Sequence, residues 1–309
     1  MSSLIEQAAR RMEQLIAAGV ELQDLLPQAA AEPSAEKEGV SRAQSETASS
    51  GYVELDLPSL ALQGFLVPGA SRSQLADQYR VIKRPLIDNA MGKGTAASLK
   101  HANLIMVTSA LPGEGKSFTS LNLALSIAAE LDHRVMLVDA DVARPSVLRM
   151  LGLSRGPGLL DVLEDRVALS DVLLRTNVDK LTLLPSGTPH PRATELLASD
   201  AMRGLLDEMA RRYPDRIIIF DSPPLLLTTE SRVLASHMGQ VVVVVHAEKT
   251  RQSVVQQALA TIESCPLKLM LLNQASANSA GSYGEGYGYG YGYGYGEGQS
   301  FGGASAVIS

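Results

Sequence analysis

Several features that would point to other classes of protein are scarce in this 309-residue sequence. It has one cysteine, Cys265, and no tryptophan, so an internal disulfide and a cluster of cysteine metal ligands are both excluded. Its 27 basic and 33 acidic residues give a net charge of −6, without the basic excess that coats nucleic acid. No apolar run approaches the ~18 residues of a membrane span. We therefore expect a cytoplasmic protein that binds no nucleic acid, has Cys265 in its core and meets a membrane only through a partner.

The composition changes along the chain and predicts three regions. Residues 1–54 begin with a short amphipathic pattern and continue into a stretch rich in Ala, Ser, Glu and Gln, so we expect an N-terminal helix and a flexible linker. Residues 55–275 carry the apolar runs of a folded domain. Residues 276–309 are rich in Gly and Tyr and have no apolar run to bury, which predicts a disordered tail.

Strand-length apolar runs alternate with helical patterns in the central region. Near-continuous apolarity is typical of strands that are buried on both faces of a parallel sheet. Helical patterns at 117–131 and 194–212 supply crossovers, and a helix that begins near Ser73 is expected to end or kink at Pro85. The sequence thus predicts an α/β fold with a doubly wound, mostly parallel sheet flanked by helices. The runs are residues 104–107, 135–138, 181–184, 217–220, 241–245 and 267–272.

The strongest motif is the segment Ala-Leu-Pro-Gly-Glu-Gly-Lys-Ser at residues 110–117. It follows an apolar run, opens a helical pattern and matches GxxxxGK[ST] except for alanine at its first position. Gly113 and Gly115 allow backbone N–H groups to turn inward around phosphates, at the positive end of a helix. Lys116 would reach the β- and γ-phosphates, and the Ser117 hydroxyl would bind Mg²⁺. A plain tight turn needs the glycines but not the Lys-Ser pair, so the segment predicts a P-loop nucleotide site.

Acidic residues follow two further apolar runs. Asp139 and Asp141 come after residues 135–138, and Asp221 comes between residues 217–220 and a double proline. Because ligands collect at the carboxyl ends of parallel strands, all three carboxylates should converge on the P-loop. Asp221 is of the Walker B type, whereas Asp139 and Asp141 suit a second metal contact or a base. A single Asp after a strand is often only a helix cap, but beside a Lys-Ser pair these acids predict Mg-nucleotide chemistry.

With these motifs in place, the chain resembles the bacterial tyrosine autokinases (BY-kinases), in particular the stand-alone cytoplasmic type of exopolysaccharide and capsule loci. The resemblance rests on residues 107–145, 185–197 and 217–224 and on the tyrosine-rich tail. It implies a P-loop ATPase fold related to partition and septum-placement ATPases, with ATP and Mg²⁺ as cofactors. The implied site comprises Lys116, Asp139 and Asp141 for catalysis, Gly113, Glu114, Gly115, Lys116, Ser117, Phe118 and Asn273 for nucleotide binding, and Ser117, Asp139, Asp141 and Asp221 for the metal.

The family pattern also implies individual roles. Asp139 falls where an acid activates the acceptor hydroxyl, and Asp141 where an acid helps to hold magnesium. Asn273 resembles an asparagine that contacts adenine in related ATPases, although an asparagine that ends a strand also suits a turn. Two positions depart from the pattern, since Ala143 stands where the family often has arginine and Phe118 replaces a common threonine. A charged motif implicated in ring assembly would fall on Asp77, Arg80 and Lys83.

Six of the nine tyrosines lie in the tail. Glycines between them keep the backbone slack, so that successive hydroxyls can enter the active site of a neighbouring copy. A sticky low-complexity tail that associates by stacking is the alternative interpretation. The predicted phosphoacceptors are Tyr283, Tyr287, Tyr289, Tyr291, Tyr293 and Tyr295.

The resemblance implies an ATP- and Mg-dependent protein-tyrosine autokinase that phosphorylates its own tail in trans and regulates exopolysaccharide polymerisation or export. The implied partners are a cytoplasmic segment of a transmembrane polysaccharide chain-length-determinant protein and further copies of the chain, in a dimer or ring with tail exchange. The chain would then be peripheral to the inner membrane. Two alternatives stay open: an inactive nucleotide-sensing scaffold, and a partition- or septum-type ATPase switch, which usually has an extra lysine early in its P-loop. Residues 110–113 contain none.

Overall fold

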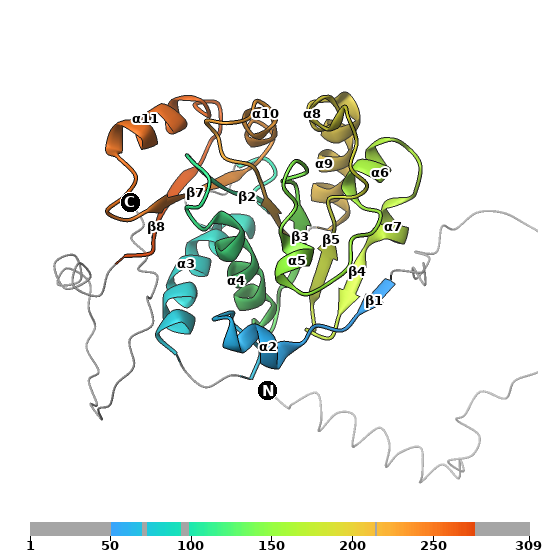
Figure 1. Cartoon of the computed structure of the whole chain (residues 1–309), viewed down its shortest axis with the longest axis horizontal. Coiled ribbons are helices and arrows are strands. Elements are labelled where there is room, and N and C mark those ends of the chain that lie inside the picture. Colours follow the sequence, from blue (N-terminus) through green and yellow to red (C-terminus); the bar gives the residue numbers. More distant parts are fainter. Residues whose placement is uncertain (1–50, 70–72, 94–98, 214, 276–309) are drawn as a thin grey trace, which may run out of the picture. The chain divides into compact units, whose positions relative to one another are not determined.

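The apolar runs of the sequence form six of the strands in the computed structural model (Figure 1). The structure describes residues 51–69, 73–93, 99–213 and 215–275, and the expected N-terminal helix, most of the linker and the tyrosine-rich tail lie outside them. Within the described residues, no helix combines the length and the apolarity needed to cross a membrane. The six strands are β2 (Leu104–Ser109), β3 (Arg134–Asp139), β5 (Leu181–Leu184), β6 (Arg216–Asp221), β7 (Gln240–His246) and β8 (Lys268–Asn273).

Two short strands extend one edge of the sheet beyond the sequence prediction. β1 (Gly51–Val53) comes from residues assigned to the linker, and β4 (Leu174–Thr176) was not predicted. Each has three residues, too few to show an apolar run. β1 pairs in parallel with β4, whereas β4 is antiparallel to β5. The strand order is β1-β4-β5-β3-β6-β2-β7-β8 and all other pairs are parallel, so the predicted doubly wound, mostly parallel sheet is confirmed.

Alternate residues of the central strands enter two separate hydrophobic cores. In β2, Ile105 and Val107 point to one face and Leu104 and Met106 to the other, and all four are fully buried. The first face packs against α2 (Leu57–Leu62), α3 (Gln74–Ala90), α4 (Lys116–Ala128) and α5 (Val147–Met150). The second packs against α6 (Leu159–Leu163), α7 (Leu169–Val172), α8 (Ala193–Leu197), α9 (Asp200–Arg212), α10 (Glu230–Ala235) and α11 (Gln252–Ala260). Cys265 lies in this second core, as expected.

The structure narrows two helix predictions. The helix that begins after Ser73 does not end at Pro85 but continues to Ala90. Leu86 and Ile87 beyond the proline are buried, and burial of such side chains contributes about 1.5–3 kcal/mol each, enough to offset the roughly 3 kcal/mol cost of an internal proline. The helical pattern over 194–212 forms two helices, α8 and α9, because Ser199 is an N-cap whose Oγ accepts a hydrogen bond from Met202 N at 3.2 Å.

The Lys83 side chain forms its contacts inside the domain. Its Nζ donates to Ser126 O at 2.6 Å, in the last turn of α4, and lies 2.8 Å from Glu130 Oε1. Because the side chain is only 7% exposed, it joins α3 to the end of α4 and does not present its charge to another copy. The other two residues of the predicted assembly motif, Asp77 and Arg80, are exposed and pair with each other at 2.6 Å.

Candidate active site

The phosphate-binding loop leads from the end of β2 into α4. Gly113 and Gly115 adopt φ angles of +82° and +93°, a left-handed region that strongly favours glycine. A Cβ at Gly115 would also collide with the side-chain amide of Asn273. No side chain of the described residues caps the first turn of α4, so its N-terminal N–H groups are available to bind phosphate, as in a P-loop.

Lys116, the first residue of α4, reaches across this space to Asp141. Its Nζ lies 2.7 Å from Asp141 Oδ2 and 3.3 Å from Ser117 Oγ. Burial by itself would lower the pKa of Lys116, but the nearby carboxylates, Asp221 first among them, raise that pKa above its usual value. The lysine therefore carries its full charge in an enclosed site.

Asp139 and Asp221 are cross-strand neighbours at the ends of β3 and β6. Asp221 is fully buried and accepts a hydrogen bond from Ser120 Oγ at 3.0 Å. Asp139 Oδ2 accepts from the backbone N–H groups of Ser146 and Val147, at 3.0 and 2.9 Å, whereas its Oδ1 is buried and has no partner among the described residues. Burial, reinforced by Asp221, raises the pKa of Asp139 to about 7. Such a carboxyl changes its protonation state near neutral pH.

The oxygen ligands at this site fit a magnesium ion. Among the described residues, no three His, Cys, Asp or Glu side chains gather into a protein-only metal cage, and Lys116 lies among the carboxylates instead. Mg²⁺ does not need such a cage, because it commonly takes one or two carboxylates together with substrate phosphates and water. Ser117 and Asp141 beside the loop, with Asp221 behind them, can supply hard oxygen ligands of this kind.

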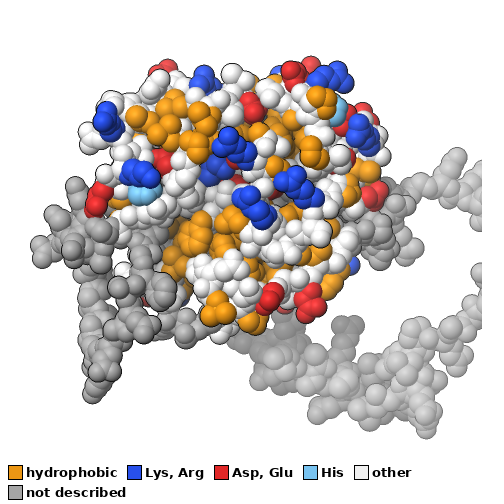
Figure 2. All heavy atoms as spheres, in the orientation of Figure 1, with side chains coloured by type: hydrophobic (Ala, Val, Ile, Leu, Met, Phe, Trp, Pro, Cys, Tyr) orange, Lys and Arg blue, Asp and Glu red, His pale blue; other side chains and the backbone are white. Residues whose placement is uncertain are grey.

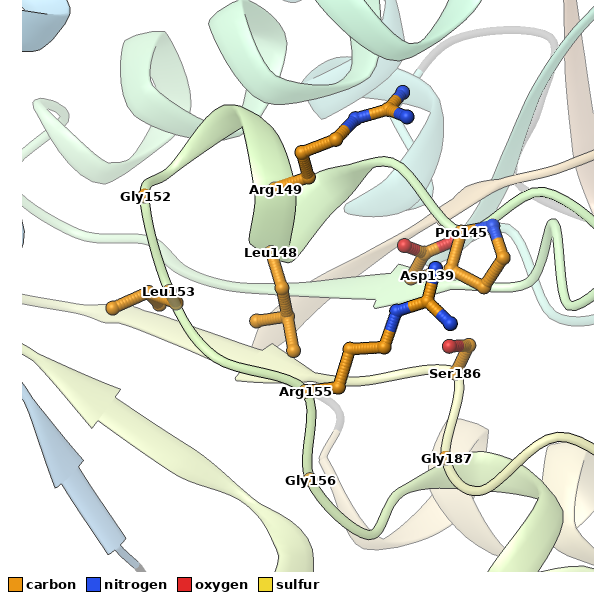
Figure 3. Close-up of a pocket in the computed structure, with 10 residues that line it drawn as sticks. All are labelled: Asp139, Pro145, Leu148, Arg149, Gly152, Leu153, Arg155, Gly156, Ser186 and Gly187. Atoms are coloured by element: carbon orange, nitrogen blue, oxygen red, sulfur yellow. The ribbon is translucent and has the colours of Figure 1, made fainter.

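Two cavities open beside these residues. The larger, of ≈ 640 Å³, is lined by the P-loop residues from Pro112 to Phe118 except Glu114, by Asp141 and Arg144, and by the double proline after β6. The smaller, of ≈ 290 Å³, is lined by Asp139 and by the loops after α5 and β5 (Figure 3). Arg149 lines both. Basic side chains gather in the middle of this face, where Figure 1 places α5 and the start of α4 (Figure 2). The larger cavity therefore has the size and charge for a nucleotide.

The chain is similar in sequence to known bacterial proteins. A family model described as an AAA domain matches residues 102–274. The tyrosine-protein kinase YwqD of Bacillus subtilis is 30% identical over 215 residues, which are 69% of this chain and 86% of the relative. The tyrosine-protein kinase CpsD of Streptococcus agalactiae is 31% identical over 201 residues, which are 64% and 86%. The chain belongs to the bacterial tyrosine-protein kinases.

Other members of the family are much longer than the matching region. The tyrosine-protein kinase ptk of Acinetobacter johnsonii is 35% identical over 188 residues, which are 60% of this chain but 25% of the relative. Among solved structures, the chimerical protein CapA2B2 aligns with a TM-score of 0.56 and 26% identity, over 71% of this chain and 92% of that one. The kinase domain of the Escherichia coli tyrosine kinase ETK aligns with a TM-score of 0.55 over 76% and 97%, and its 22% identity supports the fold alone.

In this kinase the side chains of Glu114 and Asn273 form hydrogen bonds that stabilise the P-loop. Glu114 Oε2 accepts from Leu111 N at 2.6 Å, and its other oxygen accepts from the Thr250 hydroxyl. Asn273 Nδ2 donates to the backbone oxygen of Glu114 at 2.9 Å. Both side chains are buried, so they fix the shape of the loop, and direct contact of these residues with a nucleotide stays a prediction.

Phe118, which departs from the family pattern, packs against a segment near the start of the domain. Its ring lies 5.1 Å from that of Phe65, centroid to centroid, and it also lines the larger cavity. Leu66 N donates to Asn122 Oδ1 at 2.8 Å one turn further along α4. Phe118 therefore packs the residues after α2 against the wall of the nucleotide cavity.

Of the residues that line the smaller cavity, the sequence assigned a role only to Asp139. Arg149, Arg155 and Ser186 belong to no motif of general physical meaning, and only the resemblance over residues 185–197 included one of them. The predicted site residues Lys116, Ser117, Asp139, Asp141 and Asp221 are brought together as expected, whereas the tail tyrosines lie outside the described residues. The roles assigned to each of these residues remain predictions.

Proposed function

We propose that the chain is an ATP- and Mg-dependent protein-tyrosine autokinase that phosphorylates the tyrosine cluster of another copy. The observation that carries the proposal is the convergence of Lys116, Asp141, Asp139 and Asp221 on one P-loop, in a chain that belongs to the tyrosine-protein kinases. Phosphoryl transfer depends mainly on positioning and on charge stabilisation. A buried lysine and hard oxygen ligands beside a phosphate-binding loop supply both.

The residues of the site have different roles in phosphoryl transfer. Lys116 would exchange Asp141 for the β- and γ-phosphates of ATP, while Ser117, Asp141 and Asp221 would hold the magnesium ion. When bound, that ion neutralises charge on the phosphate oxygens. Asp139 accepts the proton of the tyrosine hydroxyl at its unpartnered Oδ1. A free phenol has a pKa of ~10 and is neutral at pH 7, so a positioned carboxylate assists its attack on the γ-phosphorus.

The acceptors we propose are the six tail tyrosines. From Asn273 to the cluster is 10–22 residues (283 − 273 and 295 − 273), and a flexible chain of that length reaches roughly 15–28 Å. Such a span serves transfer between copies of a homo-oligomer, either a dimer or a ring. The proposed biological role is control of exopolysaccharide polymerisation or export. The activating partner would be the cytoplasmic segment of a transmembrane chain-length determinant, which would place this kinase peripherally at the inner membrane.

Anti-phosphotyrosine blotting with intact mass measurement tests the proposal. The chains compared are wild type, Lys116→Met and a full-length variant with phenylalanine at all six tail tyrosines, each with and without Mg-ATP. Phosphate is expected on the tail of the wild type alone. Steady ADP release without phosphotyrosine would instead favour a partition-type ATPase. If neither product forms even with the proposed activator present, the nucleotide-sensing scaffold would be the remaining interpretation.

A further inference from the structure

Three tyrosines lie outside the tail, and their surroundings differ. Tyr79 on α3 is 1% exposed, so its hydroxyl is closed to any enzyme. The Arg216 guanidinium covers the ring of Tyr213, 4.4 Å from the centre of that ring. Tyr52 on β1 is 63% exposed, and its hydroxyl forms no hydrogen bond with another described residue. Of these three tyrosines, Tyr52 is the one that an enzyme can reach.

The sequence around Tyr52 is similar to that around the proposed tail acceptors. Gly51 precedes Tyr52, and a glycine also precedes five of the six tail tyrosines. The sixth, Tyr283, has a glutamate two residues further on, as Tyr52 does. The other two tyrosines outside the tail follow glutamine and arginine instead. A kinase that accepts the Gly-Tyr dipeptide of the tail would therefore also accept the dipeptide on β1.

The strand that carries Tyr52 can leave the sheet while the domain stays folded. β1 has three residues and lies at the edge of the sheet, where it pairs with β4 alone (Figure 1). The next buried residue, Leu55, is anchored, because its N–H donates to Asn177 Oδ1 at 2.9 Å and its carbonyl oxygen accepts from Asn177 Nδ2 at 3.0 Å. Short edge segments of this kind open locally at low cost. Three extended residues before the anchor let Tyr52 reach roughly 10 Å beyond it.

A cation on β4 is placed to bind a phosphate on Tyr52. Tyr52 and Arg175 are paired positions of β1 and β4, so their side chains leave the same face of the sheet. Arg175 is exposed and forms no ion pair within the described part of the chain. Guanidinium groups bind phosphate through short charge-assisted hydrogen bonds. A phosphate on Tyr52 would therefore join β1 to β4 by an ion pair that the unmodified tyrosine lacks.

We propose that Tyr52 is a further acceptor of this kinase, phosphorylated by a second copy, and that Arg175 then binds the new phosphate. The phenol oxygen bonds to the γ-phosphorus of ATP as the bond from that phosphorus to the β-phosphate oxygen breaks, and ADP leaves. The phenol proton passes to the Asp139 carboxylate of the copy that binds ATP, as proposed for the tail. The modified strand then returns to the sheet edge, where its phosphate keeps β1 paired with β4. This inference rests on the proposed function and adds an acceptor outside the tail.

The test of the acceptor uses two full-length chains. The wild type is the phosphate donor. The receiving chain combines Lys116→Met with phenylalanine at the six tail tyrosines, so it neither phosphorylates itself nor offers a tail. After incubation of both chains with Mg-ATP, intact mass counts the phosphates on the receiving chain and peptide mapping places them. Tyr52→Phe is then added to the receiving chain, and Tyr213→Phe is added to a separate sample as the matched control.

We expect one phosphate on the receiving chain, its loss with Tyr52→Phe and its retention with Tyr213→Phe. If the donor phosphorylates its own tail but the receiving chain gains no phosphate, or gains it at another residue, the Tyr52 site is wrong while the kinase assignment stands. If the donor itself gains no phosphate even with the proposed activator, the proposed function fails, and this inference fails with it.

Hydrogen exchange tests the role of Arg175. Phosphorylation of Tyr52 should slow the exchange of the β1 backbone amides about tenfold, the value of one hydrogen bond to a charged group. Arg175→Ala should abolish this slowing although Tyr52 is still phosphorylated. Arg203→Ala, which removes an exposed arginine on α9, should retain it. Equal exchange of β1 before and after phosphorylation would overturn the proposed ion pair.

Discussion

Lys116 and Asp141 form an ion pair of 2.7 Å across the mouth of the P-loop. The two residues belong to different elements, since Lys116 begins α4 and Asp141 lies two residues beyond β3. The lysine is thus held by a carboxylate at the place where a family P-loop holds phosphates. Any nucleotide that binds Lys116 must first separate this pair.

Replacement of Asp141 should therefore affect nucleotide binding and catalysis in opposite directions. In Asp141→Asn the lysine loses the carboxylate that pairs with it directly, so we expect ADP without Mg²⁺ to bind several-fold more tightly by calorimetry. Phosphotyrosine formation with Mg-ATP should fall at least about 100-fold, as with the loss of other charge-stabilising groups. Asp132→Asn, on the surface after α4, is the control. Weaker metal-free ADP binding in Asp141→Asn would contradict this view of the ion pair.

Asp139 should lower the stability of the nucleotide-free protein above neutral pH. Burial and Asp221 raise the pKa of Asp139 to about 7, against 3.8 ordinarily, so ionisation disfavours the folded state. The stability that comes from the protonated carboxyl is fully present below about pH 4 and is lost as the pH rises through 7. Asp139→Asn should thus unfold several degrees higher than wild type at pH 8, with a smaller difference at pH 5.5, and should lose autophosphorylation. An equal melting temperature at pH 8 would contradict the raised pKa.

Gly115 and Asn273 should show strong coupling in a double-mutant cycle. Asn273→Ala removes a buried hydrogen bond to Glu114 O and should cost about 1–3 kcal/mol in unfolding free energy. Gly115→Ala should cost more, because of its φ of +93° and the collision with the Asn273 amide. Removal of that amide relieves the collision, so urea unfolding should show the double variant to be less destabilised than the sum of the single variants. Additive losses would exclude the contact.

Lys83 should matter for stability and Arg80 should not. Lys83→Met leaves the Ser126 carbonyl without its cation and Glu130 with only the 3.9 Å contact to the exposed Arg84. Loss of such a largely buried pair costs about 3 kcal/mol. Arg80→Ala removes an exposed pair with Asp77, for which less than about 1 kcal/mol is expected. Thermal unfolding of both variants checks the difference. Because Arg80→Ala should keep its fold, sedimentation of this variant and of the wild type at equal concentration then shows whether Arg80 contributes to assembly.

Phosphorylation of the tail should change the oligomeric state. Six phosphotyrosines add about −9 to −12 charges, more than the net charge of −6 on the whole chain. Bare tails are expected to dock in neighbouring copies, and modified tails to repel one another and release. Light scattering before and after exhaustive phosphorylation measures the change, and the six-phenylalanine chain is the control. An unchanged mass after full modification would exclude this regulation.

Strong local signals predicted most of the fold and the centre of the site. The buried strands could be recognised in the sequence because both of their faces are apolar. Residues 110–117 contain a Lys-Ser pair that a tight turn does not require. The edge strands β1 and β4 were missed because three residues carry no periodicity. The continuation of α3 past Pro85 depends on burial of Leu86 and Ile87, a tertiary effect that local propensity does not contain.

The smaller cavity illustrates the remaining limit of prediction from sequence. Arg155 and Ser186 are 31 residues apart (186 − 155) and come from two loops that meet only because β3 and β5 are neighbours. Asp161, which fixes one of those loops, has the form of an ordinary helix-capping acid in sequence. Its burial would raise its pKa, but the N–H groups of Thr188 and Gly158 lower that pKa below the usual value. That balance is visible only in the folded chain.

The last strand of the sheet ends on the phosphate-binding loop itself. Asn273 closes β8 and bonds to Glu114 O, and Gln274 Nε2 donates to Gly113 O at 3.4 Å. On the proposed function, the acceptor tyrosines follow directly after the strand that contacts the phosphate-binding loop. A pull on the chain beyond Ala275 would then act, through the two amide side chains of Asn273 and Gln274, on the turn that binds phosphate.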